Sequence, residues 1–497
     1  MSAVSDLLAF QRETEALAQI MGHLGWDQET MMPRGAADQR GDEMAALEGV
    51  LHARRTDPRL GEWLDRAAHE SQTQTHTQTM AEAAQLRLIA RAYARACRVP
   101  VALAARIARV TSLSQGRWAA ARKAEDLSGF LPVLAEVIAL RREEAQALAS
   151  GGDAYDAALQ GYEPGITGAE IAAVFDRMRP RLVALRAGLR DGPDAPVLHG
   201  HFPRAAQLAL AHEVAGAFGY DLTRGRIDEA VHPFSSGSHN DVRITTRIDE
   251  TEPLGCIYST IHEVGHAGYE QNITQDYGLS VLGQGVSMGV HESQSRIYEN
   301  QLGRSPAFCH WLYGRMRDHF GPLSVSSPEA FTRAVNRVAS GFIRTEADEV
   351  HYNLHIMLRF DLERALIGGD LAVCDLEAAW NDRFAADFGV AVDRPSDGVL
   401  QDVHWPVGLF GYFPTYSLGN VYAGCLHMAL RAAVPGLDDR LAQGDLAPAL
   451  GWLRDNLQIH GALRDPRDTV EHATGAPVGE APLLTYLETK YSALYAA

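Results

Sequence analysis

The run Thr260 to His266 constrains the fold of this chain more than any other feature, because its chemistry requires a helix. It reads Thr-Ile-His-Glu-Val-Gly-His, with a glutamate directly after the first histidine. On a helix, His262 and His266 lie one turn apart on the same face, so both imidazoles can reach one tetrahedral metal ion. Glu263 then lies beside the ion, where it can take a proton from the attacking water. The run therefore predicts two ligands and the base of a zinc hydrolase.

The residues before and within this run predict the helix that it needs. Thr251 is a candidate N-cap, and Pro253 follows it in the first turn. Ile257, Ile261 and Val264 then recur at helical spacing and form one apolar face. We therefore expect the run on a helix with one buried side.

A zinc site of this kind needs a third protein ligand. A metzincin would have a glycine three residues and a histidine six residues after the second histidine, where this chain has Tyr269 and Asn272. The remaining common arrangement takes a glutamate from a second helix, and Glu292 follows after an interval long enough for a loop and a return. Glu270 and His291 are rivals, although Glu270 would place three ligands in a nearly straight line. Glu292 is the expected third ligand.

A series of short motifs runs through the chain in order. The motifs are His232–Phe234, Asp241–Thr245, His262–His266, His291–Gln294, Ile343–Asp348 and Gly398–Trp405. Together with the opening Leu24–Pro33, this series resembles the carboxypeptidase Taq family of zinc metallocarboxypeptidases over nearly the whole chain. The resemblance implies a helical peptidase that removes single residues from peptide C-termini, with zinc or sometimes cobalt, usually as a homodimer.

The expected fold is mainly α, namely a large helical zincin-type peptidase with a deep cleft and a small β-sheet beside the metal site. We expect residues 1–497 to form a single peptidase unit. In it, the mostly helical half 1–200 covers the cleft and the half 201–497 carries the zinc site. The Gly- and Pro-containing segment 191–196 is the clearest connector between the two halves.

Two further patterns place elements of the catalytic half. Between Leu222 and Ile248, Val242 and Ile244 alternate with polar residues in the period of a half-buried strand. In zinc peptidases an edge strand lines the cleft and pairs with the substrate backbone, so we expect this strand beside the metal as such an edge. A long helical pattern from Pro328 to Ile367 is expected to carry Arg344.

The net charge and the cysteine content indicate which partners and which cellular compartment to expect. The formal net charge of −18 argues against nucleic acid, which demands a basic footprint. We find neither a basic segment followed by an apolar stretch at the start nor an apolar run long enough for a membrane span, so a cytoplasmic protein without a membrane partner is expected. The five cysteines include no close pair and are typical of a reducing compartment.

An exopeptidase must bind the free carboxylate of its substrate, and a buried arginine suits this task because its planar fork matches two oxygens. Arg344 and Arg243 are the candidates. The structural alternative for Arg344 is a pair with Asp348 on one helix face, and for Arg243 it is a cross-strand salt bridge. The family resemblance favours Arg344.

Transition-state stabilisation needs a donor that faces the oxyanion. His404, Tyr412 and Tyr416 lie on one glycine-containing loop, similar to the histidine and tyrosines that follow the zinc site in helical oligopeptidases. We favour His404 and Tyr412 as catalytic residues, and packing for Tyr416. His232 is a further candidate for contact with substrate, with stabilisation of its loop as the alternative.

Two features near the site stay open. The pair His351 and His355 repeats the spacing of the first pair, but Tyr352 stands where the glutamate would be, so a polar network is favoured over a second metal. The acidic residue that orients a ligand in some related sites would follow Glu292 by four residues, where the chain has Arg296. The sequence therefore offers no candidate for the carboxylate that orients either imidazole.

The predicted mechanism has zinc held by His262, His266 and Glu292. Glu263 deprotonates the water that attacks the C-terminal peptide bond and passes the proton to the leaving amine. Arg344 holds the terminal carboxylate of the peptide. An endo-acting zinc oligopeptidase of the same helical architecture is the alternative, and a binding protein without catalysis is disfavoured because both ligating histidines and the base are present.

Overall fold

The computed structural model describes residues 2–72, 78–189 and 195–495. Within these ranges the chain is mainly helical with one small sheet, which confirms the predicted class. The chain divides into two compact units, each assembled from three segments. Unit 1 comprises Met1–Cys97, Pro196–Val335 and Leu426–Pro477, and unit 2 comprises Arg98–Ala195, Asn336–Cys425 and Val478–Ala497.

The expected connector 191–196 lies outside the described residues at positions 191–194, and one boundary between the units falls between its last two residues. The expected single peptidase unit, with residues 1–200 covering a deep cleft and residues 201–497 carrying the site, stays a prediction.

Unit 1 contains the sheet and the helices that surround it. Its helices are α1 (Ala3–Thr30), α2 (Ala37–Arg55), α3 (Pro58–Gln72), α4 (Met80–Arg98), α9 (Arg204–Ala217), α10 (Pro253–Asn272), α11 (Met288–Arg296), α12 (Pro306–Phe320), α13 (Pro328–Val335), α17 (Leu437–Leu441), α18 (Ala447–Asn456) and α19 (Pro466–Thr474). Its shorter elements are the 3-10 helices η1 (Arg34–Ala36), η2 (Gln275–Tyr277) and η6 (Gln458–His460) and the π-helix η3 (Ile297–Gly303).

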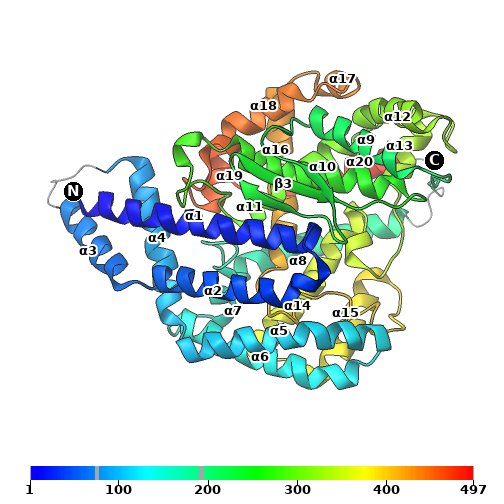
Figure 1. Ribbon diagram of the computed structural model, residues 1–497. Coiled ribbons are helices and arrows are strands. Elements are labelled where there is room, and N and C mark those ends of the chain that lie inside the picture. Colours follow the sequence, from blue (N-terminus) through cyan, green and yellow to red (C-terminus); the bar gives the residue numbers. More distant parts are fainter. Residues whose placement is uncertain (1, 73–77, 190–194, 496–497) are drawn as a thin grey trace. The chain divides into compact units, whose positions relative to one another are not determined.

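The sheet has three strands in the order β1-β3-β2. They are β1 (Ile227–Glu229), β2 (Ser235–Ser238) and β3 (Asp241–Thr246). β3 pairs in parallel with β1, where Ile227 faces Ile244, and antiparallel with β2, where Ser236 faces Arg243. The predicted strand is therefore confirmed, but its prediction as an edge strand is wrong, because both sides of β3 are occupied. β3 packs against α10, which carries the two histidines (Figure 1).

The start of α10 is fixed by its capping residue. Glu252, and not the predicted Thr251, is the N-cap. Its carboxylate accepts hydrogen bonds from the N–H groups of Leu254 at 3.1 Å and Gly255 at 2.7 Å. These bonds satisfy N–H groups that have no partner within the helix, and Pro253 needs none at its position.

The apolar face of α10 is buried as predicted, since Ile257, Ile261 and Val264 have no exposed surface. On another side of the helix, α10 approaches the backbone of α11 at Gly265. A Cβ atom at this position would lie 2.5 Å from Cα of Ser295. Only glycine permits this approach, which brings the helix of the two histidines against the helix of Glu292.

Unit 2 is helical. It contains α5 (Val101–Ala124), α6 (Leu127–Ala149), α7 (Ala154–Leu159), α8 (Gly168–Leu189), α14 (Glu349–Gly368), α15 (Leu376–Phe388) and α20 (Ala481–Tyr495), with the 3-10 helices η4 (Arg344–Glu346) and η5 (Val373–Asp375). Helix α16 (Pro414–Ala433) contributes residues to both units, and the last residue of α4, Arg98, belongs to unit 2.

The single helix predicted for residues 328–367 is wrong. Residues 336–348 interrupt it and contain the short turn η4. A new helix begins after the interruption because the Asp348 carboxylate accepts hydrogen bonds from the N–H groups of Val350 at 2.9 Å and His351 at 3.1 Å. This side chain is an N-cap, which favours a fresh helix start over a continuous helix.

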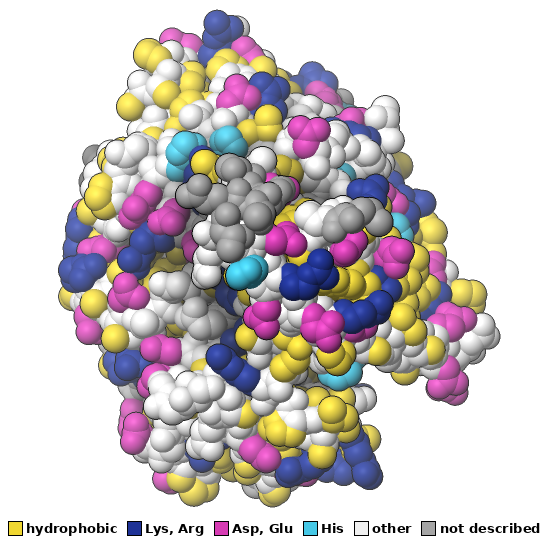
Figure 2. Space-filling model, turned by 90° about the vertical axis from the view of Figure 1, so that its left-hand side faces the viewer, with side chains coloured by type: hydrophobic (Ala, Val, Ile, Leu, Met, Phe, Trp, Pro, Cys, Tyr) yellow, Lys and Arg dark blue, Asp and Glu magenta, His cyan; other side chains and the backbone are white. Residues whose placement is uncertain are grey.

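The described residues give the distribution of charge on one face and the state of the thiols. On the face drawn in Figure 2, acidic and basic side chains are interspersed, and the described residues there form no continuous basic surface. No helix in the described ranges is both long and apolar enough to cross a membrane. All five cysteines are free; Cys97 and Cys374 are exposed, and the other three are buried.

Candidate metal centre

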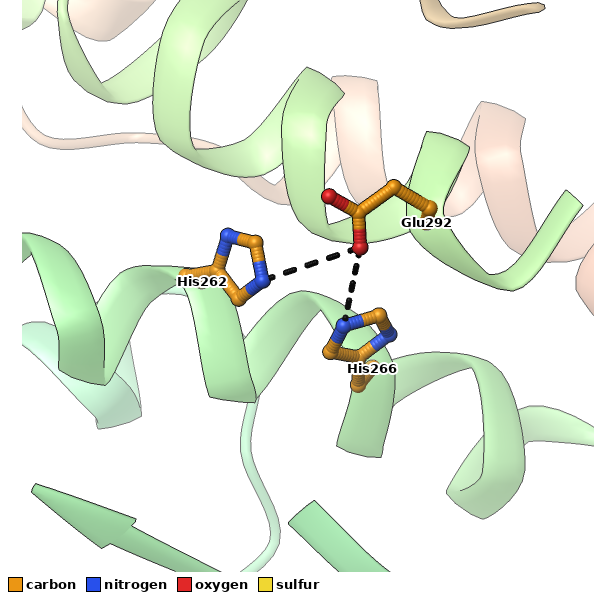
Figure 3. A group of neighbouring side chains, drawn as sticks. All are labelled: His262, His266 and Glu292. Carbon is orange, nitrogen blue, oxygen red and sulfur yellow. Dashed lines mark ion pairs between the residues drawn. The ribbon is translucent and has the colours of Figure 1, made fainter. Parts of the chain in front are cut away.

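Three side chains from two packed helices converge in unit 1. His262 and His266 project from α10, and the Glu292 carboxylate points toward both rings from α11 (Figure 3). Oε2 of Glu292 lies 3.8 Å from Nε2 of His262 and 3.4 Å from Nε2 of His266. One ligand atom from each residue lies within 4.8 Å of the other two.

These separations fit a tetrahedral ion. Metal–ligand bonds of about 2.1 Å at tetrahedral angles place neighbouring ligand atoms about 3.4 Å apart. Two imidazole nitrogens and one carboxylate oxygen are also the donor set of many catalytic zinc sites, which leave a fourth position for water or substrate. Among the residues that the structure describes, no other group of three or more histidine, cysteine, aspartate or glutamate side chains is arranged to hold a metal ion.

The second oxygen of Glu292 is engaged by a neighbouring cation. Nε of Arg296 donates a hydrogen bond of 2.7 Å to Oε1, so Oε2 is the oxygen that faces the histidines. Burial alone would raise the pKa of the Glu292 carboxyl, but the Arg296 guanidinium and the two histidines hold it well below its usual value. Glu292 is therefore ionised at neutral pH, as a metal ligand must be.

Glu299 orients one of the two histidines, and the sequence did not indicate it. Its Oε2 lies 2.9 Å from Nδ1 of His262. Arg296 and Arg304 donate to the same carboxylate at 3.3 and 3.1 Å. Although burial opposes ionisation, the hydrogen bond with His262 and the two arginines lower the pKa of Glu299. Because Nδ1 is held by this carboxylate, Nε2 of His262 is left to face the metal position.

The two rivals of Glu292 lie behind the other histidine and outside the ligand group. Nδ1 of His291 is 2.6 Å from Nδ1 of His266. On the far side of the ring, Nε2 of His291 is 3.0 Å from Oε1 of Glu270. Neither residue belongs to the group of converging ligand atoms, so the geometry favours Glu292 as the third ligand.

Glu263 follows the first histidine on α10 and is 6% exposed. Burial raises the pKa of its carboxyl to about 7, with Glu292 acting in the same direction and His262 against it. A carboxyl with this pKa can both take and give a proton near neutral pH, which is what a general base that later serves as the acid must do.

Arg344 lies in unit 2 and belongs to a buried charge triad. Its Nη2 and Nε donate to Oδ1 of Asp402 at 2.8 and 3.1 Å. Nε of the fully buried Arg359 donates to Oδ2 of the same carboxylate at 2.7 Å. The alternative pair of Arg344 with Asp348 is wrong, because Arg344 lies on the turn η4 while Asp348 caps α14. The triad combines two cations with one anion and so carries a net charge of +1.

His404 adjoins this triad and is neutral. Burial lowers the pKa of its ring to about 3, and the guanidinium groups of Arg344 and Arg359 act in the same direction, against the pull of Asp402. Its Nε2 lies 3.2 Å from the hydroxyl of Tyr416. The ring of Tyr412 is also near, with centroids 5.6 Å apart. The structure thus brings together the three loop residues that the sequence singled out, and it gives Tyr416 a polar contact in addition to packing.

Arg243 and His232 lie in unit 1, on or beside the sheet. Arg243 on β3 is bound through Nε and Nη2 to Asp241, both at 2.7 Å, and stacks over the ring of Trp26. The ion pair is within one strand, so the alternative of a cross-strand salt bridge is wrong. His232 is exposed in the segment between β1 and β2.

The second histidine pair forms no such group. His351 and His355 are buried on α14, and both rings pack against Phe388. Nδ1 of His351 pairs with Asp348 at 2.8 Å, and burial next to Arg359 lowers the pKa of His355 well below its usual value. The described residues around this pair contain no cluster of metal-binding side chains.

Comparisons with known proteins show the family to which the chain belongs. The family model described as carboxypeptidase Taq (M32) metallopeptidase matches residues 6–491. Thermostable carboxypeptidase 1 of Thermus thermophilus is 43% identical over 507 residues, covering 99% of each chain, and carboxypeptidase 1 of Bacillus subtilis is 33% identical over 95% of this chain and 94% of its own.

Solved structures of the same family share the fold. The M32 carboxypeptidase from Deinococcus radiodurans R1 is 36% identical with a TM-score of 0.95, covering all of both chains. Metallocarboxypeptidase 1 of Trypanosoma cruzi is 33% identical with a TM-score of 0.95, covering 98% of this chain and 99% of that chain. The chain belongs to the carboxypeptidase Taq (M32) family of metallopeptidases and is a metal-dependent carboxypeptidase.

Proposed function

We propose that this carboxypeptidase uses a zinc ion held by His262, His266 and Glu292. The observation that carries the proposal is the convergence of two imidazole nitrogens and an ionised carboxylate oxygen at separations near those of a tetrahedral site. Cobalt accepts the same donors and is the second candidate. A bound ion of this type supplies Lewis-acid chemistry, because it polarises a carbonyl group and acidifies water.

Glu263 is the proposed general base. One of its carboxylate oxygens takes the proton of the water that attacks the C-terminal peptide bond, and then gives this proton to the nitrogen of the leaving residue. The pKa of about 7 supports both steps, since the carboxyl is neither strongly acidic nor permanently protonated. Its place next to His262 on the same helix supports a position beside the reacting atoms.

Arg344 is the proposed binding residue for the terminal carboxylate of the substrate. The triad with Asp402 and Arg359 has one positive charge in excess, and Arg344 is only 6% exposed. A buried charge without a counterion is costly, so an arriving carboxylate would neutralise the triad and gain strong, charge-assisted hydrogen bonds. This requirement explains in physical terms why a free C-terminus would be needed.

His404 and Tyr412 are proposed to donate hydrogen bonds to the oxygen that becomes negative in the transition state. His404 is neutral at the pH of the reaction, so it acts through one N–H group and keeps the other nitrogen as an acceptor. The contact with Tyr416 supports one orientation of the ring. Tyr416 is thus proposed to position His404.

Arg243 and His232 remain proposed substrate-binding residues. The ion pair with Asp241 and the stacking on Trp26 hold the Arg243 guanidinium in one orientation, which supports a binding role. Because β3 is the central strand, an extended peptide cannot pair with its backbone, and the outer edges of the sheet belong to β1 and β2.

We also propose that the enzyme works in the cytoplasm as a homodimer. The five free thiols support a reducing compartment. The dimer rests on the family resemblance and is tested by light scattering of the purified protein.

Mass spectrometry of a peptide and its C-terminally amidated twin tests the assignment of Arg344. With zinc-loaded enzyme we expect single-residue losses from the free peptide only, and none after chelation. Arg344→Met should lower kcat/KM for the free peptide by roughly 30-fold or more, because a buried charge pair contributes about 2–5 kcal/mol. Arg243→Met tests the competing candidate and should lower kcat/KM less than Arg344→Met does. A wild-type value in Arg344→Met together with a large loss in Arg243→Met would transfer the role to Arg243.

A further inference from the structure

The contacts behind His266 define a chain of hydrogen bonds that ends at the protein backbone. Nδ1 of His266 meets Nδ1 of His291 at 2.6 Å, and Nε2 of His291 meets Oε1 of Glu270 at 3.0 Å. The N–H group of Gly285 donates to the same oxygen at 2.9 Å. Glu270 is 6% exposed, so the end of this chain at Glu270 is buried.

The proton positions along this chain follow from the metal centre. Nε2 of His266 faces Glu292, and as a ligand atom it must present its lone pair. The proton of this neutral ring is then on Nδ1, and Nδ1 of His291 can only accept it. The proton of His291 is consequently on Nε2, where it is donated to Glu270. Each contact has one donor and one acceptor.

We propose that His291 and Glu270 are positioning residues that fix the tautomer and the orientation of His266 for metal binding. This inference rests on the proposed role of His266 as a ligand. It assigns a role to Glu270 and His291, the two residues that the sequence left as alternatives to Glu292 as the third ligand. In this role neither of them is a metal ligand.

The packing around His291 supports a fixed ring. Its ring lies 4.7 Å from that of His266 and 5.4 Å from that of Tyr269, centroid to centroid. A Cβ atom on Gly285 would lie 2.5 Å from Cδ2 of His291, so the glycine backbone packs closely against this edge of the ring. A ring held in this way cannot turn to present its other nitrogen to His266.

The two histidine ligands, His262 and His266, are therefore oriented by different hydrogen-bond partners. Nδ1 of His262 meets the Glu299 carboxylate directly, whereas Nδ1 of His266 meets a neutral imidazole that in turn meets Glu270. A carboxylate partner makes the ligand ring more basic than a neutral partner does. Glu270→Gln should consequently weaken metal binding less than Glu299→Gln does.

The test measures cobalt affinity by competition with a chelator, read from the visible absorption of the bound ion, in the full chain. His291→Leu removes the acceptor and should weaken binding about 10- to 100-fold, the usual effect of losing a partner of a ligand. His291→Asn returns an acceptor oxygen near the place of Nδ1 and should bind at least several-fold more tightly than His291→Leu. Far-ultraviolet circular dichroism of the metal-free variants checks that each one folds.

Two outcomes would overturn the inference. Affinity and spectrum like those of the wild type in His291→Leu would show that His266 needs no partner. Equal weakening in His291→Leu and His291→Asn would show that the ring matters only for packing. Failure of the metal centre itself is recognised separately, because in that case His266→Ala would bind cobalt like the wild type.

Discussion

Adding one methyl group at Gly265 should disrupt the metal centre without touching a ligand. The substitution Gly265→Ala places a Cβ atom 2.5 Å from Cα of Ser295, 2.6 Å from O of Gln294 and 2.9 Å from its carbonyl carbon. All three atoms belong to the backbone of α11, so no side chain can rotate away. The strain must be relieved by a movement of α11 against α10.

The size of that movement follows from the contacts. Comfortable carbon–carbon contacts begin at about 3.5 Å, so α11 has to shift by about 1 Å at Ser295. Glu292 is on the same helix, and metal bonds tolerate only about 0.2 Å of displacement. Overpacking of this kind costs about 1–3 kcal/mol. We expect the zinc dissociation constant to rise at least tenfold, which corresponds to about 1.4 kcal/mol.

Gly314→Ala is the matched control. Gly314 is also a helical glycine of unit 1, on α12, and a Cβ atom there meets nothing within 4 Å. This variant should bind zinc like the wild type and gain up to about 1 kcal/mol of stability from helix propensity. Chelator competition gives the zinc affinities, and thermal unfolding in excess chelator gives the stabilities. Zinc affinity in Gly265→Ala within twofold of the wild type would refute the reasoning.

Two further predictions concern buried carboxylates of unit 2. Asp402→Asn leaves two buried guanidinium groups without their anion and should destabilise the fold by about 3–5 kcal/mol, whereas Glu488→Gln, which breaks the exposed pair with Arg181, should cost at most about 1 kcal/mol. Comparable unfolding midpoints in urea for these two variants would contradict this. Burial raises the pKa of Glu363 to about 7, against hydrogen bonds from Trp405, Tyr155 and the Gly411 backbone. The folded state therefore holds this proton more tightly than the unfolded state, and the contribution of Glu363 to stability should fall by about 3 kcal/mol as the pH rises from about 4.5 to about 7. Unfolding of Glu363→Gln should lack this part of the pH dependence, and identical pH profiles would refute it.

The centre of the site could be predicted from sequence because one local period determines it. The helical repeat alone places His262 and His266 on one face, and a second short helix is enough to bring Glu292 to them. The mainly helical class follows from the same kind of local pattern. Arg344 is proposed for the site on the family resemblance, because no local pattern distinguishes it from other arginines.

The rest depends on contacts that a local pattern does not contain. Glu299 reaches His262 through the π-helix that begins at Ile297, and such an element has no recognisable spacing. The pairing of Arg344 with Asp402 joins residues 58 positions apart. The central place of β3 depends on strand order, which alternation of side chains cannot reveal. The helix break before Asp348 was missed because a single capping residue outweighed a long helical pattern.

The turnover of Glu263→Gln at full zinc occupancy tests the central claim most directly. Gln has nearly the shape of Glu but cannot take the proton of the attacking water. The account predicts that this variant binds zinc as tightly as the wild type while kcat falls by at least about 100-fold. Turnover within tenfold of the wild type, with zinc fully bound, would contradict the assignment of Glu263 as the base of this metal centre.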